Sequence, residues 1–216
     1  GTYCRLIEQT TQQGKEKMFL DSENRYYVEQ ENFSKIPGSP VAYWGNPIAL
    51  VAFEHEVLSD IASTKTGMQT GDNNRFLRLW HEIEYQKSCL HNADVSTTKD
   101  GKIKWIPYNK GGDFRKWYGN QEYVLNWQND GLEAKEYAIS LYKCVTRTIK
   151  NIPYFYRETI SWSKISSGNI AFRYYPQGFI FDVAGCCVFT DMISLNKLLG
   201  FVNSTVAKYY LSLLSP

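Results

Sequence analysis

The sequence predicts an α+β domain with a mixed, mostly antiparallel sheet and flanking helices, on three observations. First, 216 residues that are 43% hydrophobic and 21% charged are sufficient for a core and typical of a globular chain. Second, residues 158–189 alternate between apolar and polar side chains and carry glycines at turn positions, which indicates several antiparallel strands. Third, residues 132–150 and 195–214 have apolar side chains at helical spacing.

The first third of the chain predicts one strand, one turn and one helix. Residues 25–33, "RYYVEQENF", alternate enough for a strand, and the prolines and glycine of "SKIPGSP" then predict a turn. We place a module boundary at this turn. Residues 1–36 are interpreted as an N-terminal extension or the remnant of a preceding module, and residues 37–216 as one domain. Helical spacing over residues 47–62, with Pro47 in the first turn, predicts a helix.

The middle of the chain predicts two strands and a helix around a polar loop. Residues 75–83 read as a strand after a turn, and residues 88–101 as a loop or hairpin. Residues 122–131 predict a strand that ends at a turn, directly before the helix at 132–150. The basic C-terminal end of that helix suits the helix dipole.

Enzyme and metal motifs are absent from the sequence. The three histidines are scattered, no H-E-x-x-H or G-x-S-x-G pattern occurs, and the five cysteines lack metal-ligand spacing. "NIPY" at 151–154 has Ile152 where the Asn-Pro-Pro-Tyr motif of DNA methyltransferases has proline, so we expect a turn or the start of a strand. We therefore expect no catalytic residue, no metal and no cofactor in this chain. Reduced cysteines and the lack of a long apolar run predict a cytoplasmic protein without a membrane span.

Cations, rings and glycines are concentrated in residues 104–119, "KWIPYNKGGDFRKWYG". Such cations attract phosphates, and glycines allow a phosphate to approach the backbone N–H groups. The rings of Trp105, Tyr108, Trp117 and Tyr118 can stack on bases, but packing against the core is the favoured interpretation for each. The predicted DNA-binding residues of this set are Lys104, Lys110, Gly111, Gly112, Arg115 and Lys116.

Two further polar segments have side chains suited to phosphates or base edges, although each could simply be a turn. The segment after residue 162 contributes Ser163, Lys164, Ser166, Ser167 and Arg173, and the segment after residue 70 contributes Asp72, Asn73, Arg75 and Arg78. Three such sets without an enzyme motif favour nucleic-acid binding. This prediction requires the cations to converge on one concave face.

The same segments carry a family resemblance. "GMQTGDNNRFLRLWHEI", "KWIPYNKGGDFRKWYGNQEYVLNWQNDG" and "ETISWSKISSGNIAFRYYPQGFIFDVAGCCVF" resemble the C-terminal part of the PglX family. These are adenine-specific DNA methyltransferases of BREX phage-defence systems, related to type IIG restriction-modification enzymes. The resemblance runs from about residue 26 to the C-terminus and implies a TaqI-like target-recognition domain. It adds Thr70 to the predicted DNA-binding residues, because the family's Thr-Gly-x-Asn element matches residues 70–73.

The resemblance also implies what the chain needs from elsewhere. In this family the S-adenosylmethionine loop and the Asn-Pro-Pro-Tyr motif lie in a separate Rossmann-like domain, so we expect this chain, trimmed at both ends, to be inactive by itself. The implied partners are double-stranded DNA, the catalytic domain of the same polypeptide and other BREX components. Two alternatives remain open: a protein-docking domain would capture a partner without DNA, and a carbohydrate-binding module would bind sugars independently of salt.

Overall fold

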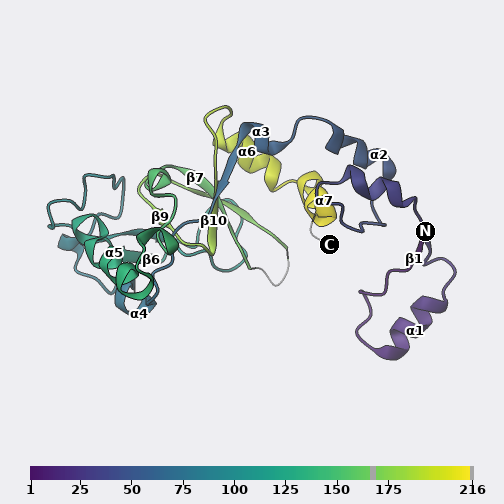
Figure 1. Ribbon diagram of the computed structural model, residues 1–216, viewed down its shortest axis with the longest axis horizontal. Coiled ribbons are helices and arrows are strands. Elements are labelled where there is room, and N and C mark those ends of the chain that lie inside the picture. Colours follow the sequence, from purple (N-terminus) through teal and green to yellow (C-terminus); the bar gives the residue numbers. More distant parts are fainter. Residues whose placement is uncertain (166–168, 215–216) are drawn as a thin grey trace. The chain divides into compact units, whose positions relative to one another are not determined.

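The computed structural model describes residues 1–165 and 169–214, which divide into two compact units. Unit 1 consists of Gly1–Leu58 and the C-terminal segment from Thr205, and unit 2 of Ser59–Ser204. Helices and mixed open sheets confirm the α+β prediction (Figure 1). The division into these units does not coincide with the module boundary predicted after residue 36. That boundary concerns the modules of a longer protein, and it stays a prediction. No helix in the described ranges is long and apolar enough to cross a membrane.

Unit 1 has little regular structure around a small core. Its antiparallel strands are two residues each, and Gln30–Lys35 form a 3₁₀-helix, so the strand predicted at 25–33 is only partly present. Ile36, Leu50 and Leu213 form the buried centre. The elements of this unit are β1 (Thr2–Tyr3), α1 (Gln12–Leu20), β2 (Tyr26–Tyr27), η1 (Gln30–Lys35), α2 (Pro47–Leu50), η2 (Val51–Glu54) and α7 (Thr205–Leu214).

The single helix predicted at residues 47–62 is wrong. This segment forms α2, η2 and a third short piece, α3 (Leu58–Ile61). Leu50 is the only buried residue in these three pieces. Because most helical stability in proteins comes from packing of an apolar face, a periodic segment without a surface to cover does not stay one helix.

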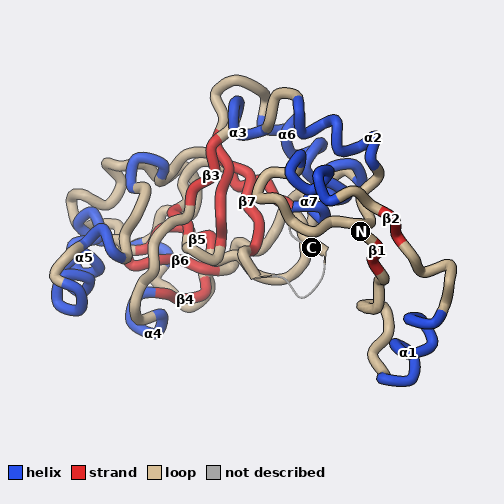
Figure 2. Tube along the Cα trace, turned by 45° about the vertical axis from the view of Figure 1, so that its right-hand side comes forward, coloured by secondary structure: helices blue, strands red, loops and turns tan. Residues whose placement is uncertain are grey.

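Unit 2 contains two four-stranded sheets (Figures 1 and 2). The first is antiparallel throughout, and in the second only the β5–β9 pair is parallel, which confirms the mixed, mostly antiparallel prediction. Across the first sheet the strand order is β3 (Ser63–Lys65), β10 (Gly185–Phe189), β7 (Thr159–Ser163) and β8 (Phe172–Tyr175). Across the second it is β4 (Leu77–Leu79), β6 (Tyr123–Asn126), β5 (Trp105–Asn109) and β9 (Ile180–Phe181).

One apolar core joins the two sheets of unit 2. Ile106 and Leu125 from the second sheet are fully buried with Cys187 from the first. The fully buried side chain of Asn109, at the end of β5, donates to Ser161 Oγ on β7 at 2.7 Å. The end of β5 is therefore fixed to the neighbouring sheet, and the chain that leaves it starts from a rigid position.

Two of the predicted helices have different bounds in the structure. Helix α5 (Gln128–Tyr142) buries Ala134 and Ala138 and ends at Lys143, which has φ +58°, so the helix predicted to residue 150 is too long. The helix predicted at 195–214 is α6 (Leu195–Val202) and α7, divided at Asn203. The remaining elements of unit 2 are α4 (Asn73–Phe76), η3 (Tyr85–Lys87), η4 (Val145–Arg147) and η5 (Ile152–Tyr154). Asn151 is the N-cap residue of η5, so of the two structures expected for "NIPY", a turn or the start of a strand, the turn is present.

Candidate nucleic-acid interface

Residues 110–119, which we call the aromatic loop, leave β5 and are held by β7 and β8. Ser163 on β7 donates to the carbonyl of Gly112 at 2.6 Å. Arg173 on β8 is only 1% exposed and donates to the carbonyls of Asp113 and Arg115 at 3.4 and 3.5 Å, and to Ser163 Oγ at 3.0 Å. Two of the three predicted sets thus meet at one place. Arg173 was predicted to contact DNA, but its guanidinium is buried under the loop and positions it.

Further backbone bonds attach the loop to the edge of the sheet. Trp117 N–H donates to the carbonyl of Phe172 at 3.2 Å, and Tyr174 N–H donates to the carbonyl of Trp117 at 2.8 Å. Asn203, which sequence reasoning missed, donates to the carbonyl of Phe172 at 2.9 Å and accepts from its N–H at 3.1 Å. Nothing in the sequence identified Asn203, because it lies 31 residues away on another element.

The two adjacent glycines of the loop have different surroundings. Gly111 has φ +78°, and its N–H already donates to Asn109 Oδ1 at 3.1 Å. A Cβ at this position would lie 2.8 Å from the carbonyl oxygen of Ala184. Gly111 therefore serves the fold and has no free N–H for the predicted phosphate contact. Gly112, with φ +126°, is exposed.

The four rings predicted to pack divide into two pairs. Trp105 and Tyr108 are buried, at 9% and 0% exposure, which confirms packing for these two. Trp117 and Tyr118 are exposed, at 52% and 61%. A fifth ring, Phe114 in the same loop, is 56% exposed. The loop therefore presents three rings to solvent above a rigid base.

The cations nearest the loop differ in availability. Lys110 is half-buried and lies 3.7 Å from Asp182, whose carboxylate also accepts from the hydroxyl of Tyr108 and from the N–H of Ala184, both at 2.8 Å. Burial, reinforced by Asp182, raises the pKa of Tyr108 well above its usual value. Arg115 makes an exposed pair with Glu122 at 3.5 Å.

Two lysines complete this group. Lys116 Nζ donates to the carbonyl of Asn203 at 3.4 Å. The side chain of Lys164 is exposed and makes no ion pair within the described residues. Its backbone N–H donates to the carbonyl of Ala184, against which Gly111 packs. The predicted Ser166 and Ser167 lie outside the described residues.

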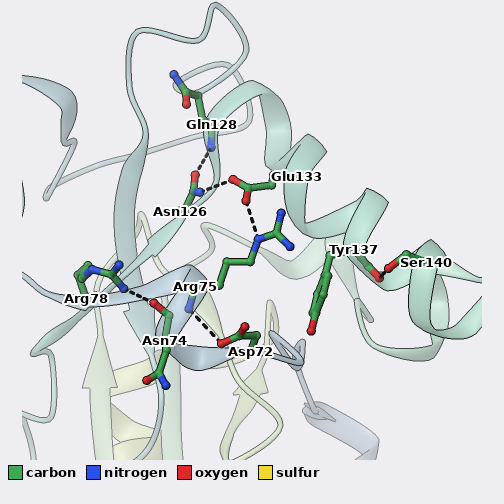
Figure 3. Close-up of polar contacts among 9 residues, drawn as sticks. All are labelled: Asp72, Asn74, Arg75, Arg78, Asn126, Gln128, Glu133, Tyr137 and Ser140. Atoms are coloured by element: carbon green, nitrogen blue, oxygen red, sulfur yellow. Dashed lines mark hydrogen bonds and ion pairs between the residues drawn. The ribbon is translucent and has the colours of Figure 1, made fainter.

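The third predicted set is a capped turn in which side chains bond to one another (Figure 3). Buried Thr70 donates to Asn73 Oδ1 at 2.6 Å, and Asp72 caps α4 by accepting from the N–H of Arg75 at 3.1 Å. Arg75 Nε donates to Glu133 Oε1 at 2.8 Å, and this guanidinium is the main reason that the pKa of Glu133 is lowered. These contacts stabilise the start of β4.

Arg78 and Lys104 lie near the same end of the second sheet. Arg78 donates to the carbonyls of Asn74 and Leu77, and both cations lie beside the ring of Trp105, at 6.0 and 5.2 Å from its centre. Lys104 precedes β5 and Lys110 follows it. Six residue steps of extended chain, at ~3.3 Å each, separate them by about 20 Å. Two sets therefore meet at the aromatic loop, whereas Arg78 and Lys104 lie toward the other end of β5, and the convergence of all three sets on one concave face stays a prediction.

Comparisons with known proteins give the family context. No protein-family model matches the chain. It is 41% identical over its whole length to the adenine-specific methyltransferase PglX of Lacticaseibacillus casei (strain Zhang). The whole chain is similar to one segment of a PglX-type protein. It is also 32% identical, over 99% of its length, to the adenine-specific methyltransferase BrxX of Escherichia coli O9:H4 (strain HS).

The extent of these matches refines the predicted resemblance. The resemblance to PglX-type proteins is confirmed and includes the first 25 residues, which carry none of the quoted motifs. The chain spans 19% and 17% of the lengths of these two relatives. In the described part, no group of His, Cys, Asp and Glu side chains is arranged to hold a metal ion.

Proposed function

We propose that this chain is the DNA-binding target-recognition segment of a PglX-type adenine-specific DNA methyltransferase that acts in BREX defence. The similarity of the whole chain to one segment in each of two adenine-specific methyltransferases supports the assignment to such a protein. The observation that carries the DNA-binding role is the aromatic loop, which is held from below by Arg173 and Ser163 and has exposed rings and cations on its outer side.

The chemistry of the loop suits a nucleic-acid backbone. Arg115 and Glu122 are about half exposed, and a surface pair of this kind is worth only about 0–1 kcal/mol, so a phosphate can replace Glu122 at little cost. Lys116 follows Arg115 in the loop, and Lys164 follows Ser163, which holds the loop, so both add positive charge to this region. The exposed rings of Trp117 and Tyr118 provide flat surfaces that can contact bases or sugars.

Methylation itself is assigned to a domain of the longer protein. The S-adenosylmethionine site and the base-flipping chemistry would lie in that domain, while this segment would hold the duplex at the chosen sequence. Such a role requires access to bacterial or phage DNA, in keeping with the predicted cytoplasmic location.

The test is duplex binding by the 216-residue chain as salt is raised. Each phosphate contact contributes about 0.9 to the slope of log affinity against log salt. A triple variant, Arg115→Gln, Lys116→Gln and Lys164→Gln, should flatten this slope. Lys110 is left intact because it contacts Asp182, and its loss would disturb the packing of Tyr108.

The matched control removes the same charge elsewhere in unit 2. Lys99, Lys150 and Lys197 are exposed and form no ion pair within the described residues, so their triple Gln variant should keep the wild-type slope. An equal change in both variants, or none in either, would contradict the proposal. Capture of a protein without DNA, or salt-insensitive binding to a sugar, would instead favour the docking or carbohydrate alternative.

A further inference from the structure

A hollow of about 350 Å³ opens on the outer face of the second sheet in unit 2. Its floor includes Pro107 on β5 and Val124 on β6, which are directly paired across the two strands. Their neighbours in sequence, Ile106 and Leu125, point into the core on the opposite face. Because successive strand residues face opposite sides, the floor of the hollow is the face of the sheet that the core does not use.

The walls of the hollow are aromatic. Trp80, which follows β4, and Tyr118, from the aromatic loop, line it while remaining 54% and 61% exposed. Phe179, from the turn between β8 and β9, adds a ring that is only 7% exposed. Three segments far apart in the sequence thus place rings around one opening. Large rings left half exposed beside a hollow offer stacking surfaces to a flat ligand.

Hydrogen-bonding groups also line this hollow. The hydroxyl of Tyr118 donates to Gln121 Oε1 at 2.8 Å, whereas Gln121 Nε2 has no hydrogen-bond partner in the described part of the chain. Asn92 and Gln177 contribute two more amides. Side-chain amides match the donor and acceptor edges of nucleobases, and rotation of the Gln121 amide can offer its unused donor to a ligand.

Hydrogen bonds hold the backbone of the segments that line the hollow. Gly178 N–H donates to the carbonyl of Tyr156 at 2.9 Å, and Tyr156 N–H donates to the carbonyl of Phe179 at 2.8 Å. A Cβ on Gly178, which has φ +111°, would lie 2.8 Å from the backbone nitrogen of Ala93. Trp80 N–H donates to the carbonyl of Glu122 at 2.9 Å. A preformed site loses less conformational freedom on binding.

We infer that this hollow binds a single unpaired nucleobase of DNA, stacked against Trp80 and Tyr118. The volume lies at the small end of ligand sites, which suits one flat heterocycle rather than a large cofactor. Tyr118 lies two residues from Lys116 and three from Arg115, so the phosphates beside an unpaired base would meet cations. A sugar would use the rings but not these cations. The inference rests on the proposed DNA-binding function.

The experiment compares three duplexes of the same sequence: fully paired, with one extra unpaired base, and with an abasic residue at the same bulge. The abasic bulge keeps the backbone distortion and removes only the ring. The 216-residue chain should bind the base-containing bulge about 5- to 150-fold more tightly than the abasic one, the range expected for one stacked base. Fluorescence anisotropy at a fixed salt concentration measures each affinity.

Variants assign the effect to the hollow. Trp80→Ala should bring this ratio toward one without weakening binding to the paired duplex. Tyr118→Ala should also lower the ratio, whereas Tyr118→Phe should keep most of it. Phe114→Ala is the matched control, because Phe114 is an equally exposed ring of the same loop that does not line the hollow. Unchanged thermal melting shows that each variant is folded.

The outcomes separate the two proposals. Equal affinity for the two bulges, with firm binding to the paired duplex, overturns the inference and leaves the proposed function intact. A ratio that survives in Trp80→Ala and Tyr118→Ala overturns the assignment to this hollow. Failure to bind any duplex overturns the proposed function and the inference together, and oligosaccharide binding that Trp80→Ala abolishes overturns the inference in favour of a sugar site.

Discussion

Arg75 and Glu133 form an ion pair in which Nε and Oε1 are 2.8 Å apart, and the other carboxylate oxygen of Glu133 accepts from Asn126 at 2.8 Å (Figure 3). One carboxylate thus connects the turn before β4, the end of β6 and helix α5. Arg75, a cation predicted to bind DNA, thus also has a partner within the protein.

This pair predicts a pH-dependent contribution to stability. The pKa of Glu133 is lowered in the folded state, first by Arg75, so the stabilisation is present above the unfolded-state pKa and is lost as pH falls through the folded-state value. Both side chains are about half exposed, so at neutral pH Glu133→Gln should lower the free energy of unfolding by only about 0.5–1 kcal/mol. In acid the variant and the wild type should converge.

Urea denaturation across this pH range measures the difference. Glu136→Gln is the control, because Glu136 is exposed on the same helix and forms no ion pair within the described residues. A gap between Glu133→Gln and wild type that widens in acid would contradict the prediction.

Arg173 predicts a larger effect. Its guanidinium is buried and bonded to two loop carbonyls and Ser163, so Arg173→Ala leaves a cavity and unpaired buried groups. We expect the free energy of unfolding to fall by about 3 kcal/mol. Arg115→Ala, on the exposed side of the same loop, should change it by less than about 0.5 kcal/mol. Similar losses in both variants would show that Arg173 does not hold the loop.

Gly111 predicts a steric effect that can be separated from its backbone conformation. Gly111→Ala must adopt φ near +78° and bring Cβ to 2.8 Å from the Ala184 carbonyl. Gly101→Ala has nearly the same φ, +74°, but its Cβ meets only the amide end of Asn129. Gly101→Ala should cost about 1 kcal/mol, and Gly111→Ala about 2–3 kcal/mol. Denaturant titration of both variants measures the free energies of unfolding. Equal decreases would contradict the prediction and mean that the Ala184 carbonyl moves aside without cost.

The thiols predict a clear order of reactivity. Cys144 is exposed, and its pKa is lowered, first by a hydrogen bond with Thr146. Cys187 is fully buried, and burial raises its pKa to about 12. Because the thiolate is the reactive form, iodoacetamide at neutral pH should modify Cys187 more than about 100-fold more slowly than Cys144. Peptide mass mapping over time measures both rates, which should become similar in denaturant.

Sequence patterns predicted best where periodicity and packing agree. The alternation over 158–189 indicated several strands, and β7, β8, β9 and β10 lie there. The segment 47–62 has the same quality of pattern but buries only Leu50, because a single sequence does not say which apolar face will meet a partner. The division of 195–214 at Asn203 depends on bonds to Phe172, a contact across 31 residues.

The candidate site was predictable in composition but not in geometry. The sequence identified the loop at 104–119 but not that Gly111 faces Ala184, or that Arg173 is buried beneath the loop. Both depend on how two sheets meet. Trp80 and Phe179 were missed altogether, because the hollow they line is formed by segments about 100 residues apart.

The way in which Arg173 holds the aromatic loop has an evolutionary consequence. Its bonds to Asp113 and Arg115 are to main-chain oxygens, which every amino acid possesses. The anchor is therefore indifferent to which side chains those positions carry. Descendants of this chain can replace Asp113, Phe114 or Arg115 while the loop keeps its course, so a single scaffold can diversify its outer surface through point substitutions alone.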